Sequence, residues 1–196
     1  MVKRLFDIIF SIIGITVLSP FLLIISIIIL LTTKGGVIYR QKRIGKNGKE
    51  FKVFKFRTMY TGSDKELRIT IGKNDSRITP IGTYLRKYKL DELPQLFNVL
   101  IGTMSFVGPR PEVPEYVALY TEEEKKVLSV KPGITDYASI VYSEENELLS
   151  GAENPNELYI TKIMPAKLKL NLKYINDMSL LTDVKVILKT IEKVFR

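Results

Sequence analysis

The chain has 196 residues, a formal net charge of +9, and neither histidine nor cysteine. This composition excludes disulfides and thiolate chemistry, so acids, lysines and tyrosines are the candidate catalytic groups. The basic surplus lies in residues 1–60, which hold 11 basic and 2 acidic side chains around a long apolar segment. Such a collar favours an anionic membrane surface over nucleic acid as the partner, with a solvated charged face as the plain alternative.

The apolar segment covers residues 5–31, where only Asp7 is charged. It is long enough to cross a bilayer, because about 20 apolar residues suffice for a helix. Basic residues flank it on both sides, and the positive-inside rule therefore places both ends on the cytoplasmic side. We expect Asp7 to form a neutralised pair with Lys3 and Arg4 at the membrane interface.

Ser19 and Pro20 divide this segment near its centre. Pro20 has no N–H, so the carbonyl of Thr16 loses its helical partner and the helix bends, while the Ser19 hydroxyl can serve a freed carbonyl. We predict a re-entrant helix–break–helix over residues 1–33, followed by a catalytic domain over 34–196. A kinked single span and a buried soluble helix are the alternatives.

The remainder is expected to contain both strands and helices. Strands are expected at 37–41 and 51–59, joined by a turn at 45–48, with a bulge between Val53 and Phe54. The expected helices are one capped by Thr79 that ends near 88, one that starts at Asp91 and stops at Gly102, a charged helix over 114–129, and two more over 165–176 and 180–195. Residues 61–77 are expected to be a loop, and residues 143–157 are expected to be loop-like or weakly helical.

The last of these helices carries Leu181, Val184, Leu188, Ile191 and Phe195 at helical spacing, with lysines opposite. This pattern predicts either core packing or a helix lying flat on a membrane surface.

Asp91 and Glu92 form an acidic pair in a basic chain. Asp91 precedes an apolar helical pattern, so it can act as an N-cap, with Glu92 favouring the helix dipole. The same pair could bind a small cation such as Mg²⁺, or one carboxylate could act as a nucleophile.

Cations that could bind phosphate accompany this pair. Arg110 lies between two prolines, which restrict its backbone and favour bidentate phosphate binding. Arg86 lies five residues before Asp91. Lys55 and Arg57 share one face of the second predicted strand, where they could contact phosphate or be solvated edge charges. Cations beside a carboxylate pair are what phosphoryl transfer requires.

These features together resemble the monotopic phosphoglycosyl transferases, also called bacterial sugar transferases. The matching stretches are KRLFDIIFS at 3–11, LSPFLL at 18–23, RQ at 40–41, RIG at 43–45, FKVFKFRTM at 51–59, TPIGTYLRKYKLDELPQLFNVLIGTMSFVGPRP at 79–111 and VKPGIT at 130–135.

The resemblance implies a small α/β catalytic domain with a re-entrant membrane helix and interfacial amphipathic helices, on the cytoplasmic face of the bacterial inner membrane. It implies that Mg²⁺ assists transfer of a sugar 1-phosphate from a UDP-sugar to a polyprenol phosphate, with downstream glycosyltransferases as further partners and no role for nucleic acid. By analogy, Asp91 attacks the β-phosphate and UMP leaves. Glu92 assists as metal partner or proton acceptor, and Arg110, Arg86, Lys55 and Arg57 bind substrate phosphate.

The chain departs from the family pattern after residue 135. Many relatives continue with a segment ending in Gly-Arg-Asn or similar, whereas this chain has no arginine between 135 and 161. The sugar that it takes is therefore left open, and Tyr137 and the following acidic loop are candidates for shaping the pocket. Two other hypotheses are direct transfer without a covalent intermediate and a non-catalytic membrane module that recruits glycan-assembly partners.

Overall fold

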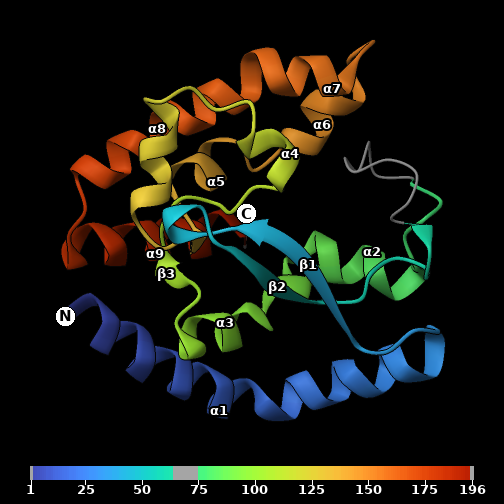
Figure 1. Ribbon diagram of the computed structural model, residues 1–196. Helices are drawn as coiled ribbons and strands as arrows, with labels where there is room; N and C mark the ends of the chain where they lie inside the picture. Colours follow the sequence, from blue (N-terminus) through green and yellow to red (C-terminus); the bar gives the residue numbers. More distant parts are fainter. Residues whose placement is uncertain (1, 64–74, 195–196) are drawn as a thin grey trace.

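The computed structural model describes residues 2–63 and 75–194. A long helix, α1 (Val2–Thr32), curves beneath a body of shorter helices and strands (Figure 1). The described strands form two small sheets, one antiparallel and one parallel, surrounded by helices. The predicted α/β class is therefore confirmed. Residues 64–74, most of the loop expected over 61–77, lie outside the described residues.

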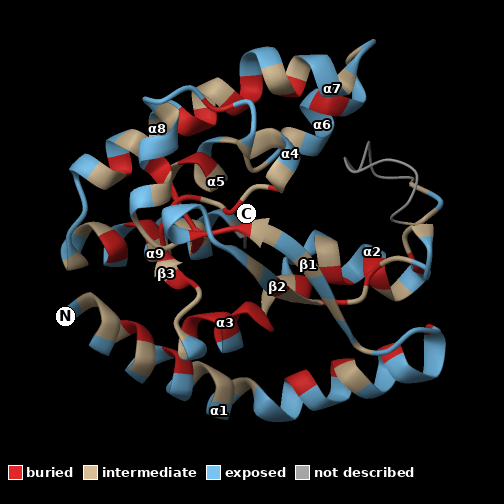
Figure 2. Ribbon diagram, in the orientation of Figure 1, coloured by how far each residue is buried: buried red, intermediate tan, exposed pale blue. Residues whose placement is uncertain are grey.

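Helix α1 continues through Pro20. The Ser19 hydroxyl donates to the Thr16 carbonyl at 2.8 Å, as expected for a carbonyl that a proline leaves without its helical partner. Among the described residues, α1 is the one helix long and apolar enough to cross a membrane, and only 11% of its most apolar window is buried. Its outward face is largely exposed (Figure 2).

The first turns of α1 are attached to the body by charged side chains. Lys3 forms an ion pair with Asp183 of α9 (Leu180–Val194) and donates to the Tyr174 hydroxyl at 3.3 Å. Arg4 donates to two carbonyls near the end of α3 (Gln95–Ile101), at 2.6 and 2.7 Å. A guanidinium at this position provides donors for the last carbonyls of the helix, of which that of Val99 also accepts from the Gly102 amide.

Asp7 is almost fully buried and accepts from the Ser105 hydroxyl at 3.0 Å and the Phe106 amide at 3.1 Å. The expectation that it pairs with Lys3 and Arg4 is therefore wrong. Both cations find partners elsewhere in the body, and the start of β3 (Ser105–Val107) offers Asp7 two donors instead.

The second half of α1 packs on the same body. Its buried residues Leu22, Ile25 and Ile29 form a cluster with Phe56 and Leu85. Because both halves of α1 contact one body, the helix lies along that body instead of projecting from it.

Strands β1 (Ile38–Ile44) and β2 (Glu50–Phe56) pair antiparallel in one unbroken register. The predicted bulge beside Phe54 is wrong: the register is continuous, and the half-buried Phe54 lies beneath the Arg40 guanidinium, 5.7 Å from the ring centroid. The connecting turn η1 (Lys46–Gly48) places Asn47 and Gly48 at positive φ, which explains the Asn-Gly sequence.

Helix α2 (Pro80–Lys87) begins where predicted, since the Thr79 hydroxyl accepts from the Gly82 amide at 3.0 Å. Helix α3 ends at Gly102, whose φ of 89° suits a glycine stop.

Strand β3 pairs in parallel with β4 (Gly133–Thr135), a contact that the sequence did not predict. The two backbone segments come so close that a Cβ on Gly133 would lie 2.1 Å from the Gly108 nitrogen. Only glycine permits this approach, which brings the segment around Arg110 against β4.

The predicted charged helix over 114–129 is wrong. Two short elements, α4 (Pro114–Val117) and η4 (Glu124–Ser129), replace it. Thr121 and Glu124 bond reciprocally through side chains and amides, a capping box that starts a new turn at this point.

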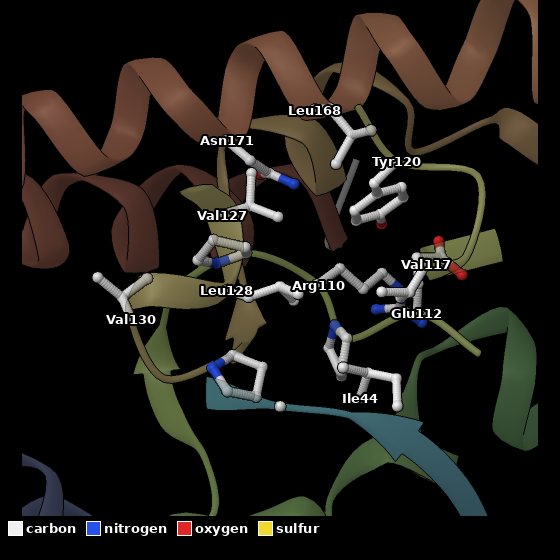
Figure 3. A pocket seen from close by; sticks show the side chains of 14 residues that line it. Ile44, Arg110, Glu112, Val117, Tyr120, Val127, Leu128, Val130, Leu168 and Asn171 are labelled. Carbon is white, nitrogen blue, oxygen red and sulfur yellow. The ribbon is translucent and has the colours of Figure 1, made fainter. Parts of the chain in front are cut away.

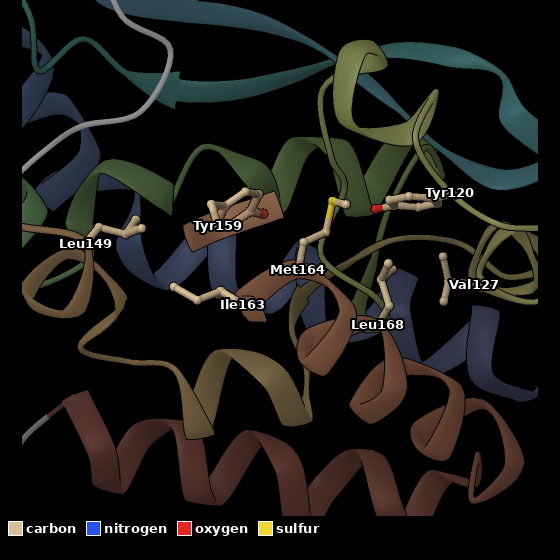
Figure 4. Close-up of a cluster of buried hydrophobic side chains, with 7 residues drawn as sticks. All are labelled: Tyr120, Val127, Leu149, Tyr159, Ile163, Met164 and Leu168. Carbon is tan, nitrogen blue, oxygen red and sulfur yellow. The ribbon is translucent and has the colours of Figure 1, made fainter. Parts of the chain in front are cut away.

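Helices α5 (Tyr137–Val141), α6 (Glu145–Ser150), α7 (Pro155–Leu158) and α8 (Met164–Asn176) follow, and the π-helical turn η5 (Tyr159–Ile163) joins α7 to α8. The region expected to be loop-like or weakly helical thus holds two short helices, and the helix expected over 165–176 is confirmed. Figure 4 shows the largest described core cluster, which η4, α6, η5 and α8 share; its residues are Tyr120, Val127, Leu149, Tyr159, Ile163, Met164 and Leu168.

Helix α9 turns its predicted apolar stripe away from the core. Leu181, Val184, Leu188 and Ile191 are all exposed, whereas Val186 is buried. The core-packing interpretation of this stripe is therefore wrong, and Phe195 lies outside the described residues.

Candidate active site

Asp91 lies in the short 3-10 turn η3 (Leu90–Glu92), which follows Lys89 in the left-handed region at φ 55°. Helix α3 begins only at Gln95, with Pro94 at its N-cap and no side-chain cap. The prediction that Asp91 caps this helix is therefore wrong. Asp91 is 8% exposed, and within the described chain its carboxylate accepts no hydrogen bond.

Glu92 points to two cations from distant parts of the chain. Its carboxylate accepts from the Lys55 ammonium of β2 at 2.8 Å and from the Arg110 guanidinium at 2.6 Å. The Glu92 side chain is 12% exposed and Lys55 is 19% exposed, so water screens this pair only weakly, whereas the Arg110 side chain is 35% exposed and its pair is more strongly screened. The predicted association of Glu92, Lys55 and Arg110 is thus present in the structure.

The pKa values of the two neighbouring acids are shifted in opposite directions. Burial opposes the ionisation of Glu92, but Arg110 and Lys55 hold its pKa well below the usual range. Burial raises the pKa of Asp91, to which Glu92 contributes further, while Lys55 and Arg86 partly oppose this rise. Glu92 is therefore ionised and occupied by its cations, and Asp91 is the more basic carboxylate, with lone pairs available.

Arg86 also interacts electrostatically with Asp91. Its Nε donates to the Thr58 hydroxyl at 2.9 Å, and its charge favours the ionised form of Asp91. Burial lowers the pKa of the Arg86 guanidinium, and Asp91 partly offsets this effect.

Arg57 does not join the group. It donates to the carbonyls of Gly36 and Gly35 at 2.8 and 2.6 Å, on the connection between α1 and β1. Strand β2 ends at Phe56, so the face that Lys55 presents does not continue to Arg57. The structure therefore brings Lys55, Arg86 and Arg110 around the acidic pair and assigns Arg57 to the connection after α1.

Sequence reasoning missed several residues that hold the Pro-Arg-Pro turn. Asp136 accepts from the Arg110 amide at 3.0 Å. Glu112 pairs with Arg43 at 3.3 Å and accepts from the Tyr159 hydroxyl. The position of Glu112 directly after Pro111 could have been noticed, but nothing local marks Tyr159, which lies 47 residues further along.

A small cavity lies behind Arg110, between the end of β1 and helix α8 (Figure 3). It has a volume of about 20 Å³, enough for about one water molecule. Asn171, whose Oδ1 has no partner among the described residues, lines it together with Glu112, whereas Asp91 and Glu92 do not. This cavity suits internal solvent and is too small for a sugar nucleotide.

Tyr137 packs against Tyr174 in the core, with ring centroids 5.8 Å apart.

The residues present fit a magnesium ion that takes some of its ligands from the phosphates of the substrate. Residues 2–63 and 75–194 contain no cluster of three or more potential metal-ligating side chains. Mg²⁺ commonly binds one or two carboxylates together with substrate phosphates. Asp91 has oxygens available for this, whereas both oxygens of Glu92 already accept from Arg110.

Comparison with known proteins places this geometry in a family. The model of the family described as bacterial sugar transferase matches residues 1–196. The chain belongs to the bacterial sugar transferase family. Several curated members resemble this bacterial sugar transferase along almost its whole length.

A UDP-glucose:undecaprenyl-phosphate glucose-1-phosphate transferase of Klebsiella pneumoniae is 40% identical over 98% of this chain and 40% of its own length. A UDP-N-acetylgalactosamine-undecaprenyl-phosphate N-acetylgalactosaminephosphotransferase of Aeromonas hydrophila is 34% identical over 98% of this chain and 43% of its own. An exopolysaccharide production protein, ExoY, of Sinorhizobium fredii (strain NBRC 101917 / NGR234) is 34% identical over 98% of this chain and 84% of its own. The chain thus spans less than half of the first two relatives.

The opposite electrostatics of the two acids predict opposite effects on stability. An ionised Asp91 with a raised pKa destabilises the fold at neutral pH, so Asp91→Asn should raise the midpoint of thermal unfolding. A gain of about 1 kcal/mol corresponds to about 2–4 °C in a domain of this size. Glu92→Gln should lower the midpoint, because it weakens two buried ion pairs.

Thermal unfolding of both variants in the same detergent at pH 7 provides the measurement. The ionised form of Glu92 stabilises the fold at neutral pH, and this stabilisation is lost as the pH falls through its lowered pKa. Equal destabilisation by Asp91→Asn and Glu92→Gln would contradict the different environments of the two acids.

Proposed function

We propose that this bacterial sugar transferase moves a sugar 1-phosphate from a UDP-sugar to a polyprenol phosphate, through a covalent intermediate on Asp91. The observation that carries the proposal is the division of labour in the acidic pair: Glu92 is occupied by Lys55 and Arg110, whereas Asp91 has no hydrogen-bond partner among the described residues. The names of the relatives support the two substrate classes.

In the first step, a carboxylate oxygen of Asp91 attacks the β-phosphorus of the UDP-sugar. The bond from that phosphorus to the bridging oxygen breaks, and UMP leaves with the bonding electron pair. In the second step, an oxygen of the polyprenol phosphate attacks the same phosphorus and the Asp91 carboxylate leaves. The raised pKa of Asp91 suits this role, because a more basic carboxylate is a better nucleophile once ionised.

The neighbouring cations offset the charge of the diphosphate. Arg110 bonds to Glu92 and Arg86 acts electrostatically on Asp91, and a guanidinium can form bidentate contacts with phosphate oxygens. The lowered pKa of Glu92 argues against its acting as a proton acceptor. Its role in this proposal is to hold Lys55 and Arg110 in place. A magnesium ion held by Asp91 and the substrate phosphates would neutralise charge on the transferring group.

We also propose that α1 enters the cytoplasmic leaflet of the inner membrane and returns. Its two halves contact the same body, through Lys3, Arg4 and Asp7 at one end and through Leu22, Ile25 and Ile29 at the other. A straight crossing would separate these ends by the bilayer. The exposed stripe of α9 would lie on the same surface, because its leucines and isoleucine face away from the core.

Exchange of labelled UMP tests whether Asp91 is the nucleophile. The wild-type enzyme should exchange labelled UMP into UDP-sugar in the absence of polyprenol phosphate, because the first step is reversible. Asp91→Asn should abolish this exchange, by about 10³-fold or more, since an amide cannot form the intermediate. Glu92→Gln should retain measurable exchange, because the attacking group remains.

Direct transfer without an intermediate is the second candidate, favoured if Asp91 serves only as a metal ligand. It predicts no exchange in the wild type until the acceptor is added. Exchange by Asp91→Asn at the wild-type rate would remove Asp91 as the nucleophile. A panel of UDP-sugars in the same assay would identify the sugar, which the family pattern leaves open.

Cysteine labelling tests the membrane topology of α1. Because the chain has no cysteine, an introduced cysteine is the single thiol that can be labelled. Single cysteines at Val2 and at Lys34, which is exposed, mark the two ends of α1. Both should be protected from a membrane-impermeant maleimide in intact spheroplasts and labelled after permeabilisation. A cysteine at Tyr60, on the exposed part of the body, is the matched cytoplasmic control. Labelling at Val2 alone in intact spheroplasts would indicate a single crossing and overturn the re-entrant arrangement.

A further inference from the structure

We propose that Asp136 is a positioning residue for Arg110, which it holds by the backbone so that the guanidinium reaches both Glu92 and the substrate diphosphate. This inference rests on the proposed function, because it assigns the way in which the phosphate-binding arginine is oriented. It concerns the first residue of the segment in which the chain departs from the family pattern.

The sequence Pro109-Arg110-Pro111 has an unusual hydrogen-bonding constraint. Neither proline has an N–H, so the amide of Arg110 is the one backbone donor of the three residues. A buried backbone donor needs a partner, and the Asp136 carboxylate supplies it at 3.0 Å. A carboxylate makes a stronger bond to an amide than a neutral acceptor does.

The turn is also held at its two carbonyls. The Pro109 carbonyl accepts from the Gly133 amide at 3.0 Å, and the Pro111 carbonyl accepts from Arg43 at 3.0 Å. Gly133 and Asp136 both belong to the segment that begins with β4. Three contacts therefore fix the backbone on both sides of Arg110, and the contact from Asp136 is the one made at Arg110 itself.

Asp136 is fully buried. Its second oxygen accepts from the amide of Ser139, at the start of α5. Both oxygens thus bond to backbone amides, and in the described chain no lysine or arginine forms an ion pair with Asp136. Its negative charge acts on the Arg110 guanidinium, where Glu92 first and Asp136 second among the acids raise the pKa of Arg110.

A buried carboxylate is costly to desolvate, so a helix cap alone is a weak reason for one at this place. Serine, threonine or asparagine would cap the five-residue α5 about as well. The charge adds something that those residues cannot supply, because Arg43 and Lys55 place further positive charge near Arg110. Asp136 balances this charge and holds Arg110 by its backbone amide. The guanidinium N–H groups remain for Glu92 and the substrate.

The test is a double-mutant cycle read out by UDP binding to the detergent-solubilised full chain in the presence of Mg²⁺. In the wild-type background, Asp136→Asn should weaken UDP binding by about 10-fold, comparable to the loss of one charge-assisted contact. In an Arg110→Ala background, the same change should have no further effect on binding, although it should still lower thermal stability.

Asp7→Asn is the matched control. Asp7 is also a buried acid that accepts from a backbone amide, that of Phe106, but it lies at α1 and not at the Pro-Arg-Pro turn. It should lower thermal stability, and any effect on UDP affinity should be the same with and without the Arg110 side chain. If Asp136→Asn does not fold, Asp136→Glu, which keeps the charge and moves it by one methylene, should show the same dependence on Arg110.

Equal weakening of UDP binding by Asp136→Asn with and without the Arg110 side chain would overturn the inference and leave the proposed function intact. Unchanged UDP affinity with reduced stability would reduce Asp136 to a helix cap. Failure of the wild-type chain to bind UDP, or binding that Arg110→Ala does not weaken, would overturn the proposed function and this inference with it.

Discussion

The arrangement of the site depends on one buried interaction, the contact of Glu92 with Lys55 and Arg110. It joins β2, η3 and the Pro-Arg-Pro turn, three segments that are distant in sequence. Both oxygens of Glu92 accept from these cations. Its neighbour, Asp91, is buried without a hydrogen-bond partner among the described residues. Two adjacent carboxylates thereby acquire different chemistry: one holds cations, and the other is available to react or to bind metal.

The body that carries this site is built on α1. Arg4 satisfies the carboxyl end of α3, whose opposite end follows Asp91 and Glu92, and Asp7 fastens β3, which leads into Arg110. Helix α1 therefore touches both segments that supply the site. In the proposed membrane arrangement, a helix attached in this way would fix the height of the acidic pair relative to the lipid surface, where a polyprenol phosphate would present its headgroup. Membrane insertion and catalytic geometry are in this sense one structural problem.

Much of this could be predicted from local sequence. The cap at Thr79, the glycine stop at Gly102 and the Ser19 contact with Thr16 follow from backbone chemistry within a few residues. The association of Lys55, Arg86 and Arg110 with the acidic pair followed from residue types and the family resemblance. The failures have a common cause: the β3–β4 pair, the Glu112–Tyr159 contact and the buried role of Asp7 depend on tertiary contacts between segments far apart, and the exposed stripe of α9 follows the same helical spacing as a buried one would.

The most direct test is intact-protein mass spectrometry of the enzyme incubated with its UDP-sugar and Mg²⁺ but without polyprenol phosphate, followed by peptide mapping. A mass increase equal to one sugar phosphate, located on Asp91 and discharged when polyprenol phosphate is added, is the result that the account predicts. An adduct on Glu92, or full turnover by an enzyme that never carries an adduct, would contradict the claim that the unpartnered acid of the pair is the nucleophile.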